Sequence, residues 1–177
     1  MTSAKFINSF FLLLIFLSPA FAQDKEDTIS EIKEKVEAIH LDTALRSVIL
    51  QNQEFLHDTS GAAGELTGFF KGKNIYKIYR SVGLPDGVEI TEFYYRKNRL
   101  IFIRKKFNSY VYDDRLKTFD YTKMNSTFSG SYYFNNDKLI EYKTKGHNRI
   151  DDQTVSTEEI LLNKSNEALG YIKNILN

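Results

Sequence analysis

The sequence predicts an α+β fold, in which an antiparallel β-meander of about six strands packs with an N-terminal and a C-terminal amphipathic helix. A unit of two aromatic, four polar and two apolar residues occurs three times, at residues 69–76, 94–101 and 133–140. This pattern is typical of a strand, a turn and a returning strand. Apolar stripes at helical spacing precede and follow these units. Consecutive hairpins between two helices favour a meander over parallel strands joined by helices.

Each hairpin unit also predicts which residues face each other. The innermost pairs are Phe70 with Ile75, Tyr95 with Leu100, and Phe134 with Leu139. Side chains alternate along a strand, so these pairs share one face of the sheet. The flanking pairs then share the other face, unless a bulge shifts the register by one residue. They are Phe69 with Tyr76, Tyr94 with Ile101, and Tyr133 with Ile140.

The flanking set is rich in tyrosine, whose phenol keeps a polar tip that tolerates water. We therefore expect the face that carries Tyr76, Tyr94 and Tyr133 to be the less covered one. These three residues are the candidate binding residues of an aromatic-rich sheet face.

Residues 1–22 have the features of a signal peptide. Lys5 supplies a positive charge, and the apolar run over residues 10–17 is shorter than the roughly 20 residues that a membrane span needs. Ala20-Phe21-Ala22 fits the small-x-small cleavage rule. We expect residues 23–177 to form a single exported domain, periplasmic or secreted, with no membrane anchor after signal cleavage.

Composition narrows the possible partners. The chain has no cysteine, so no disulfide stabilises it and no lipid can be attached at a lipoprotein cysteine. Its 24 Lys and Arg residues nearly balance its 23 Asp and Glu residues, which argues against nucleic acid as a partner. The short basic run Arg104-Lys105-Lys106 would divide between the two faces of a strand and reads as a solvated strand end.

Capping boxes mark the start of both helices. Thr28 with Glu31 predicts one N-terminus, and Ser156 with Glu159 predicts the other. The apolar stripe of the first helix consists of Ile29, Ile32, Val36 and Ile39. That of the second consists of Leu161, Ser165, Ala168, Leu169, Ile172, Ile175 and Leu176. Residues 41–50 either form a further short helix or begin the sheet.

The strands are expected at residues 65–70, 75–81, 88–95, 100–106, 128–134 and 139–144. Residues 51–64 and 147–154 read as polar connectors, and Leu84-Pro85-Asp86-Gly87 as a tight turn. The longest irregular stretch, residues 107–127, carries aromatic anchors and is expected to be an ordered excursion or an extra edge hairpin. Long connections in compact domains are often functional, so this stretch is a second candidate binding region.

No catalytic or metal-binding motif is found, and we expect no metal and no cofactor. The three histidines are isolated from one another: His40, His57 and His147. Asp113-Asp114 and Asp151-Asp152 lack the spacing of a calcium loop and read as turn acids. Glu89 and Glu92 would lie on opposite faces of one strand, so they cannot form a glycosidase pair by themselves.

From about Ile29 to Ile140, the order of features resembles uncharacterised exported single-domain proteins of Bacteroidota-type bacteria. The resemblance rests on residues 64–70, 75–78, 91–95, 99–103 and 132–140. Where those proteins often carry a double glycine before the first strand, this chain has Ala63-Gly64. The resemblance implies export and a compact helix-plus-meander fold, and it implies no activity.

Three functions are consistent with these observations. The first is a non-enzymatic exported binding or structural module, whose partner is a protein or a small-molecule ligand. The second is a hydrolase whose site is assembled from dispersed Asp, Glu and His residues. The third is a cell-envelope assembly factor or inhibitor.

Overall fold

The computed structural model describes residues 18–56, 63–147 and 155–176 of the 177-residue chain. Most of the predicted signal peptide, His57, Asp151-Asp152 and parts of the two polar connectors lie outside the described residues. The elements are α2 (Ser18–Leu41), β1 (Arg46–Gln51), the 3-10 turn η1 (Asn52–Glu54), β2 (Gly64–Lys71), β3 (Asn74–Leu84), β4 (Gly87–Arg96), β5 (Arg99–Asp113), β6 (Thr118–Asn135), β7 (Lys138–Gly146) and α3 (Thr157–Leu176).

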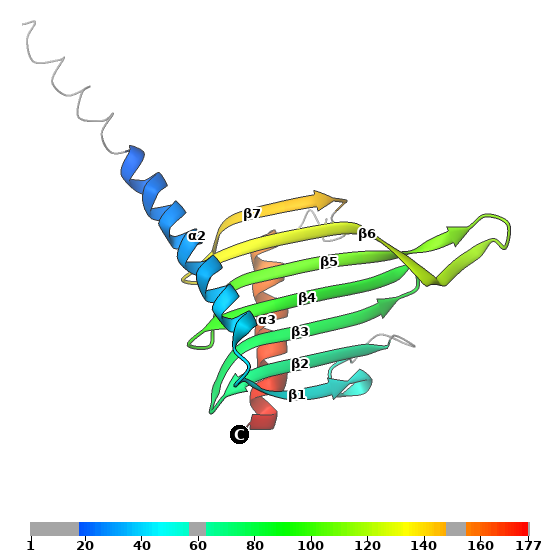
Figure 1. Ribbon diagram of the computed structural model, residues 1–177, viewed down its shortest axis with the longest axis horizontal. Coiled ribbons are helices and arrows are strands. Elements are labelled where there is room, and N and C mark those ends of the chain that lie inside the picture. Colours follow the sequence, from blue (N-terminus) through cyan, green and yellow to red (C-terminus); the bar gives the residue numbers. More distant parts are fainter. Residues whose placement is uncertain (1–17, 57–62, 148–154, 177) are drawn as a thin grey trace, which may run out of the picture.

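The strands form one antiparallel sheet in the order β1-β2-β3-β4-β5-β6-β7, so every strand pairs with its neighbour in the sequence (Figure 1). The predicted α+β meander is confirmed, with seven strands instead of about six. The additional strand is β1, which comes from the segment where the sequence left helix and strand open. Its residues Val48 and Leu50 pack on the same core as the predicted hairpins.

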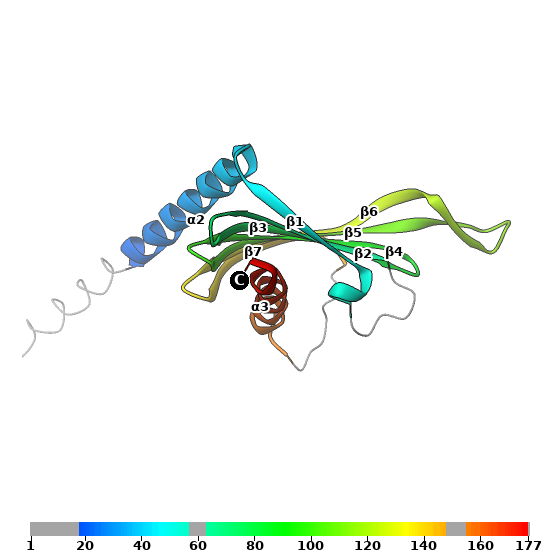
Figure 2. The same cartoon turned by 90° about the horizontal axis from the view of Figure 1, so that it is seen from below.

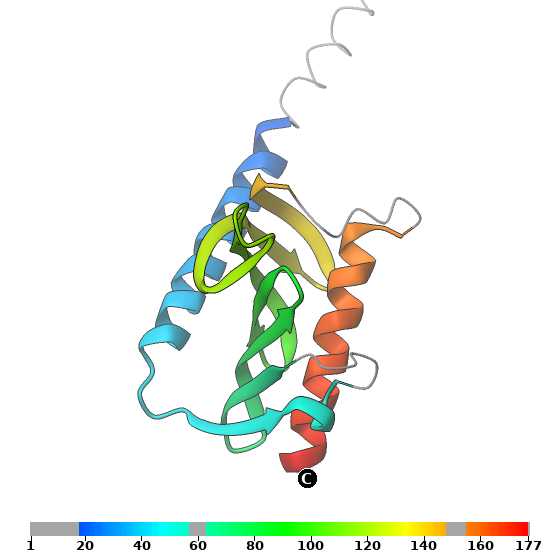
Figure 3. The same cartoon turned by 90° about the vertical axis from the view of Figure 1, so that its right-hand side faces the viewer.

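The two helices lie on opposite faces of the sheet (Figures 2 and 3). We call these the α2 face and the α3 face. On the α2 face, Ile32, Val36 and Ile39 pack with aromatic residues of the sheet, as their spacing predicted. On the α3 face, five residues of the predicted stripe are buried: Leu161, Ser165, Ala168, Leu169 and Ile172. Ile175 was expected in that stripe but is 47% exposed, whereas Leu176 packs partly buried against the core.

The three predicted inner pairs form, although one further pair lies inside each of them, and the flanking pairs differ from the prediction. Phe70, Tyr95 and Phe134 lie opposite Ile75, Leu100 and Leu139, and all six pack on the α3 face. The next pairs are Phe69 with Lys77, Tyr94 with Phe102, and Tyr133 with Glu141. Each hairpin therefore has a β-bulge after its second pair, and the extra residues are Tyr76, Ile101 and Ile140.

The two predicted helix starts have different outcomes. Helix α2 already begins at Ser18, and the Thr28 hydroxyl donates a hydrogen bond to the Asp24 carbonyl at 2.8 Å, so Thr28 lies within the helix and does not cap it. Ser156 does cap α3, because its hydroxyl oxygen accepts a hydrogen bond from the Glu159 backbone amide at 3.2 Å. This bond satisfies one of the free amides at the helix start.

We expect Ser156→Ala to lower the free energy of unfolding by about 1 kcal/mol, because the Glu159 amide loses its acceptor. Ser156→Asp restores an acceptor and should unfold close to the wild type. Urea denaturation of the three proteins measures both differences. An alanine variant as stable as the wild type would show that the cap contributes nothing.

Residues 107–127 continue strands β5 and β6 as a hairpin that projects beyond the other strands, which we call the arm (Figure 1). The aromatic rings of Tyr110, Tyr112, Phe119 and Tyr121 pack edge to face, with centroids 4.9 to 6.4 Å apart. Asp113 accepts hydrogen bonds from the backbone amides of the turn at its tip. The stretch is therefore ordered, as predicted. It is not an extra edge hairpin, because β5 and β6, which were expected to end at residue 106 and to begin at residue 128, continue through it.

Candidate functional site

The predicted aromatic face is not the less covered one, because α2 packs directly on it. Tyr94 is 0% exposed and Tyr133 is 8% exposed, and Tyr76 is partly buried in the same cluster. Burial raises the pKa of the Tyr94 hydroxyl. Phe102 fills the space between Tyr94 and Tyr133, with ring centroids 5.7 and 5.0 Å away. With α2 in place, these tyrosines form core and not a binding surface.

Helix α2 crosses only the end of the sheet where the turns β2–β3, β4–β5 and β6–β7 lie (Figure 2). The open part of the α2 face therefore lies toward the arm. There a groove of about 340 Å³ runs over strands β5, β6 and β7. We call it the cationic groove. Its lining includes four cations and two serines: Arg104, Lys106, Lys143, Lys145, Ser129 and Ser131. Gly130 and Thr144 complete it. None of the eight residues that line it is acidic.

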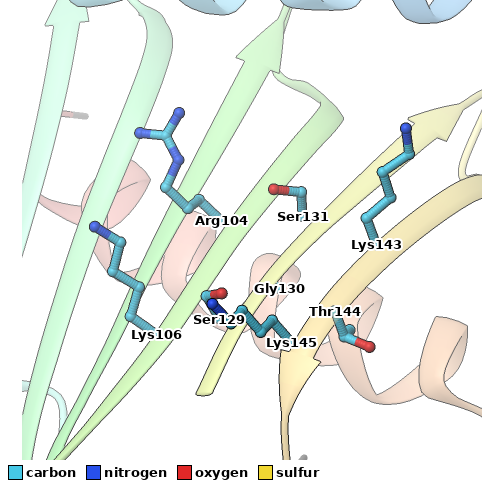
Figure 4. A pocket seen from close by; sticks show the side chains of 8 residues that line it. All are labelled: Arg104, Lys106, Ser129, Gly130, Ser131, Lys143, Thr144 and Lys145. Atoms are coloured by element: carbon cyan, nitrogen blue, oxygen red, sulfur yellow. The ribbon is translucent and has the colours of Figure 1, made fainter. Parts of the chain in front are cut away.

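The register of the sheet arranges these side chains in two rows (Figure 4). One row is Arg104, Ser131 and Lys143, and the next is Lys106, Ser129 and Lys145. Strands lie about 4.8 Å apart and two residues along a strand advance about 6.7 Å, so the backbones of the four cations mark a rectangle of roughly 10 by 7 Å. The two serines lie along its midline.

Arg104 is oriented by a carboxylate next to the groove. Its guanidinium donates to Glu92 at 3.2 Å and lies over the Phe102 ring at 5.8 Å. Glu92 also accepts from Lys77 at 2.5 Å. Burial alone would raise the pKa of Glu92, but the bonds and charges of Lys77 and Arg104 hold it below its usual value. One carboxylate thus faces two cations, and a positive charge remains in excess at this end of the groove.

Between Ser129 and Ser131, Gly130 contributes only its backbone to the groove floor. A Cβ at Gly130 would lie on the opposite face, 2.7 to 3.0 Å from the ring and hydroxyl of Tyr132. A glycine at this position therefore lets Tyr132, which is 0% exposed, fill the core behind the groove. The floor of the groove rests on a packed core.

A second groove of about 530 Å³ lies between α2 and the edge strand β7. We call it the α2–β7 groove. Helix α2 contributes Lys25, Glu26, Ile29, Ser30 and Lys33, and the sheet contributes Tyr133, Glu141 and Lys143. An ion pair of 2.5 Å between Lys25 and Glu141 joins its two sides, and the hydrogen bond from Lys25 holds the pKa of Glu141 below its usual value. Lys143 lines both grooves, so they adjoin.

The basic run Arg104-Lys105-Lys106 divides between the two faces as predicted, although it lies in mid-strand and not at a solvated end. Lys105 points to the α3 face, is 3% exposed and forms an ion pair of 2.8 Å with Glu89. Lys164 of α3 and Arg80 of β3 lie 3.7 and 3.4 Å from the same carboxylate. Glu89 and Glu92 therefore face opposite sides of the sheet, as expected, and each is held by cations.

The histidines and acidic residues considered in the sequence form no metal site within residues 18–56, 63–147 and 155–176. His40 lies in α2 and His147 just after β7, and both are exposed. No three His, Asp or Glu side chains in this part of the chain gather to hold a metal. No helix of this part is long and apolar enough to cross a membrane.

Sequence reasoning missed Lys143, Lys145, Ser129 and Ser131. A signal was present, because Lys143-Thr144-Lys145 and Ser129-Gly130-Ser131 each repeat one residue type with the period of a strand. The spacing shows that each pair shares a face. Only the register between β5, β6 and β7 shows that the pairs are neighbours. The chain matches no protein-family profile, no curated protein and no solved structure.

Proposed function

We propose that this chain is an exported, non-enzymatic binding module that captures an anionic ligand in the cationic groove. The observation that carries this proposal is the set of four cations around Ser129 and Ser131, with no acidic residue in the lining. Lysine and arginine donate charge-assisted hydrogen bonds to anions, and a serine hydroxyl adds a neutral donor. The chain is nearly neutral overall, so this local excess of positive charge is not a reflection of its composition.

The pKa shifts of Glu89 and Glu92 argue against one hydrolytic role, that of general acid. Cations hold the pKa of both Glu89 and Glu92 low. A general acid instead needs a pKa near the working pH, so that it can give up a proton during the reaction. Export follows from the predicted signal peptide, whose cleavage after Ala22 would leave both grooves and their lining residues in the mature chain.

The lysines of β7 have a second possible role, because β7 is an edge strand and lysines on an edge discourage pairing with another chain. The two roles predict different behaviour. Lysines that only protect the edge would change self-association when replaced and leave anion binding unaffected.

The test is a titration of the mature chain with inorganic phosphate and with sulfate, in which the chemical shifts of the backbone amides are measured by NMR. We expect saturable shifts centred on β5, β6 and β7 that weaken with ionic strength. Lys143→Gln with Lys145→Gln should weaken binding at least about tenfold, since each lysine is a charge-assisted donor.

The matched control is Lys73→Gln with Lys97→Gln, which removes the same charge from two hairpin turns outside the groove and should bind like the wild type. Sedimentation velocity on the same samples reports self-association. Equal weakening in both double variants, or no saturable shift in the wild type, would overturn the proposed function.

A further inference from the structure

The cationic groove ends at Lys143, where the α2–β7 groove begins. The two differ in chemistry, because the first has four cations and no acid, whereas the second has three lysines and two glutamates. One of those lysines is already paired with Glu141. A single ligand that spans both would therefore be anionic at one end and uncharged at the other.

The lining of the α2–β7 groove indicates what the uncharged end carries. Glu26 and Glu141 accept hydrogen bonds, Lys33 donates them, and Ser30 does both. A body with many hydroxyl groups satisfies such a lining, because each hydroxyl also donates and accepts. A second anionic group would be repelled by the two carboxylates. A purely apolar body would leave these polar side chains without partners, and that carries a desolvation cost.

The wall of this groove also suits a sugar ring. Ile29, which is half-buried, adds an apolar surface beside the polar groups, and the apolar faces of sugar rings pack against such surfaces. Tyr133 also lines the groove but is only 8% exposed, so it adds little to this surface. The volume of about 530 Å³ lies within the range of small-molecule sites.

We propose that the two grooves form one composite site for a sugar that carries a phosphate or sulfate ester, with the ester group over Ser129 and Ser131 and the sugar between α2 and β7. This inference rests on the proposed function, because the ester group occupies the cationic groove. Lys143 lies where the two parts meet and donates to the anionic group. No bond is made or broken.

The test is calorimetry of the mature chain with five probes: glucose 6-phosphate, glucose 6-sulfate, inorganic phosphate, sulfate and glucose. We expect each sugar ester to bind at least about tenfold more tightly than its inorganic anion, and glucose alone to bind too weakly to measure. The phosphate and sulfate arms show which ester the site prefers. Hexyl phosphate, which has the same charge as glucose 6-phosphate and an apolar body, should bind only slightly more tightly than inorganic phosphate.

Variants of the second groove separate this inference from the proposed function. Ser30→Ala with Lys33→Gln should remove the gain from the sugar and leave the affinity for the inorganic anion unchanged. Arg104→Gln should weaken every anionic probe by a similar factor. Glu34→Gln, on the same helix and outside the lining, is the control and should bind like the wild type.

The outcomes are distinct. If inorganic anions bind with the expected dependence on Lys143 and Lys145, and the sugar adds nothing, the composite site is wrong and the proposed function stands. The composite site would also be wrong if the Ser30/Lys33 variant still bound the sugar ester more tightly than the inorganic anion. The same holds if hexyl phosphate bound more tightly than glucose 6-phosphate. If no anion binds, both proposals are wrong.

Discussion

Glu89→Gln is expected to lower the free energy of unfolding by about 3 kcal/mol, which corresponds to a loss of roughly 6 to 12 °C in melting temperature. The reason is Lys105, which is 3% exposed and forms an ion pair with Glu89 at 2.8 Å. Without the carboxylate, the Lys105 ammonium is buried with two further cations nearby, Arg80 and Lys164. An uncompensated buried charge is costlier than the loss of an exposed ion pair.

Two further variants test this explanation. Lys105→Met in the Glu89→Gln background removes the unpaired charge and should recover most of the lost stability. Glu141→Gln, the same substitution in the exposed pair with Lys25, should cost less than about 1 kcal/mol. Chemical denaturation at neutral pH measures all three. If Glu89→Gln costs no more than Glu141→Gln, the buried ion pair does not stabilise the fold.

The same carboxylate gives the stability of the wild type a pH dependence. Burial alone would raise the pKa of Glu89, but Lys164, Lys105 and Arg80 together hold it below its usual value. A carboxyl with a lowered folded pKa stabilises the fold above its unfolded pKa, and this contribution is lost as the pH falls through the folded value. The stability difference between wild type and Glu89→Gln should therefore shrink between about pH 5 and pH 3.

The sequence predicted the hairpins because their signal is local. Aromatic residues on either side of a short polar turn specify two strands, and alternation then places Phe70 and Ile75 on one face. The bulges were not predicted, because the extra residue in each hairpin is itself a strand former. Tyr76, Ile101 and Ile140 suit either register, and in the structure they lie in the cluster that α2 covers.

The grooves depend on information that is not local. Arg104, Ser131 and Lys143 come from three strands and become neighbours only through the register of β5, β6 and β7. The expectation that the tyrosine face is the less covered one was wrong for a related reason. The position of a tyrosine along a strand indicates which face of the sheet its side chain lies on. The docking of α2 determines whether that face is covered. In this chain the helix covers the tyrosines and leaves the lysines open.

The docking of α3 depends on a close approach between Ile172 and Gly68, and this pair predicts a double-mutant cycle. A Cβ at Gly68 would lie 2.7 to 2.9 Å from three carbon atoms of Ile172, which is 0% exposed. Gly68→Ala should therefore cost about 1 to 3 kcal/mol through overpacking. Ile172→Ala should cost about 2 to 5 kcal/mol through the cavity that it leaves.

Together the two substitutions should cost less than the sum of their separate effects, because the new methyl group at position 68 enters the space that Ile172 vacates. We expect a coupling of about 1 to 2 kcal/mol between the two sites in urea denaturation. Gly170→Ala is the matched control, since its Cβ would meet no atom within 4 Å, and alanine in a helix should stabilise the protein by about 0.5 to 1 kcal/mol. Additive costs at positions 68 and 172 would contradict this close approach, and α3 would then be held chiefly by the rest of its apolar stripe.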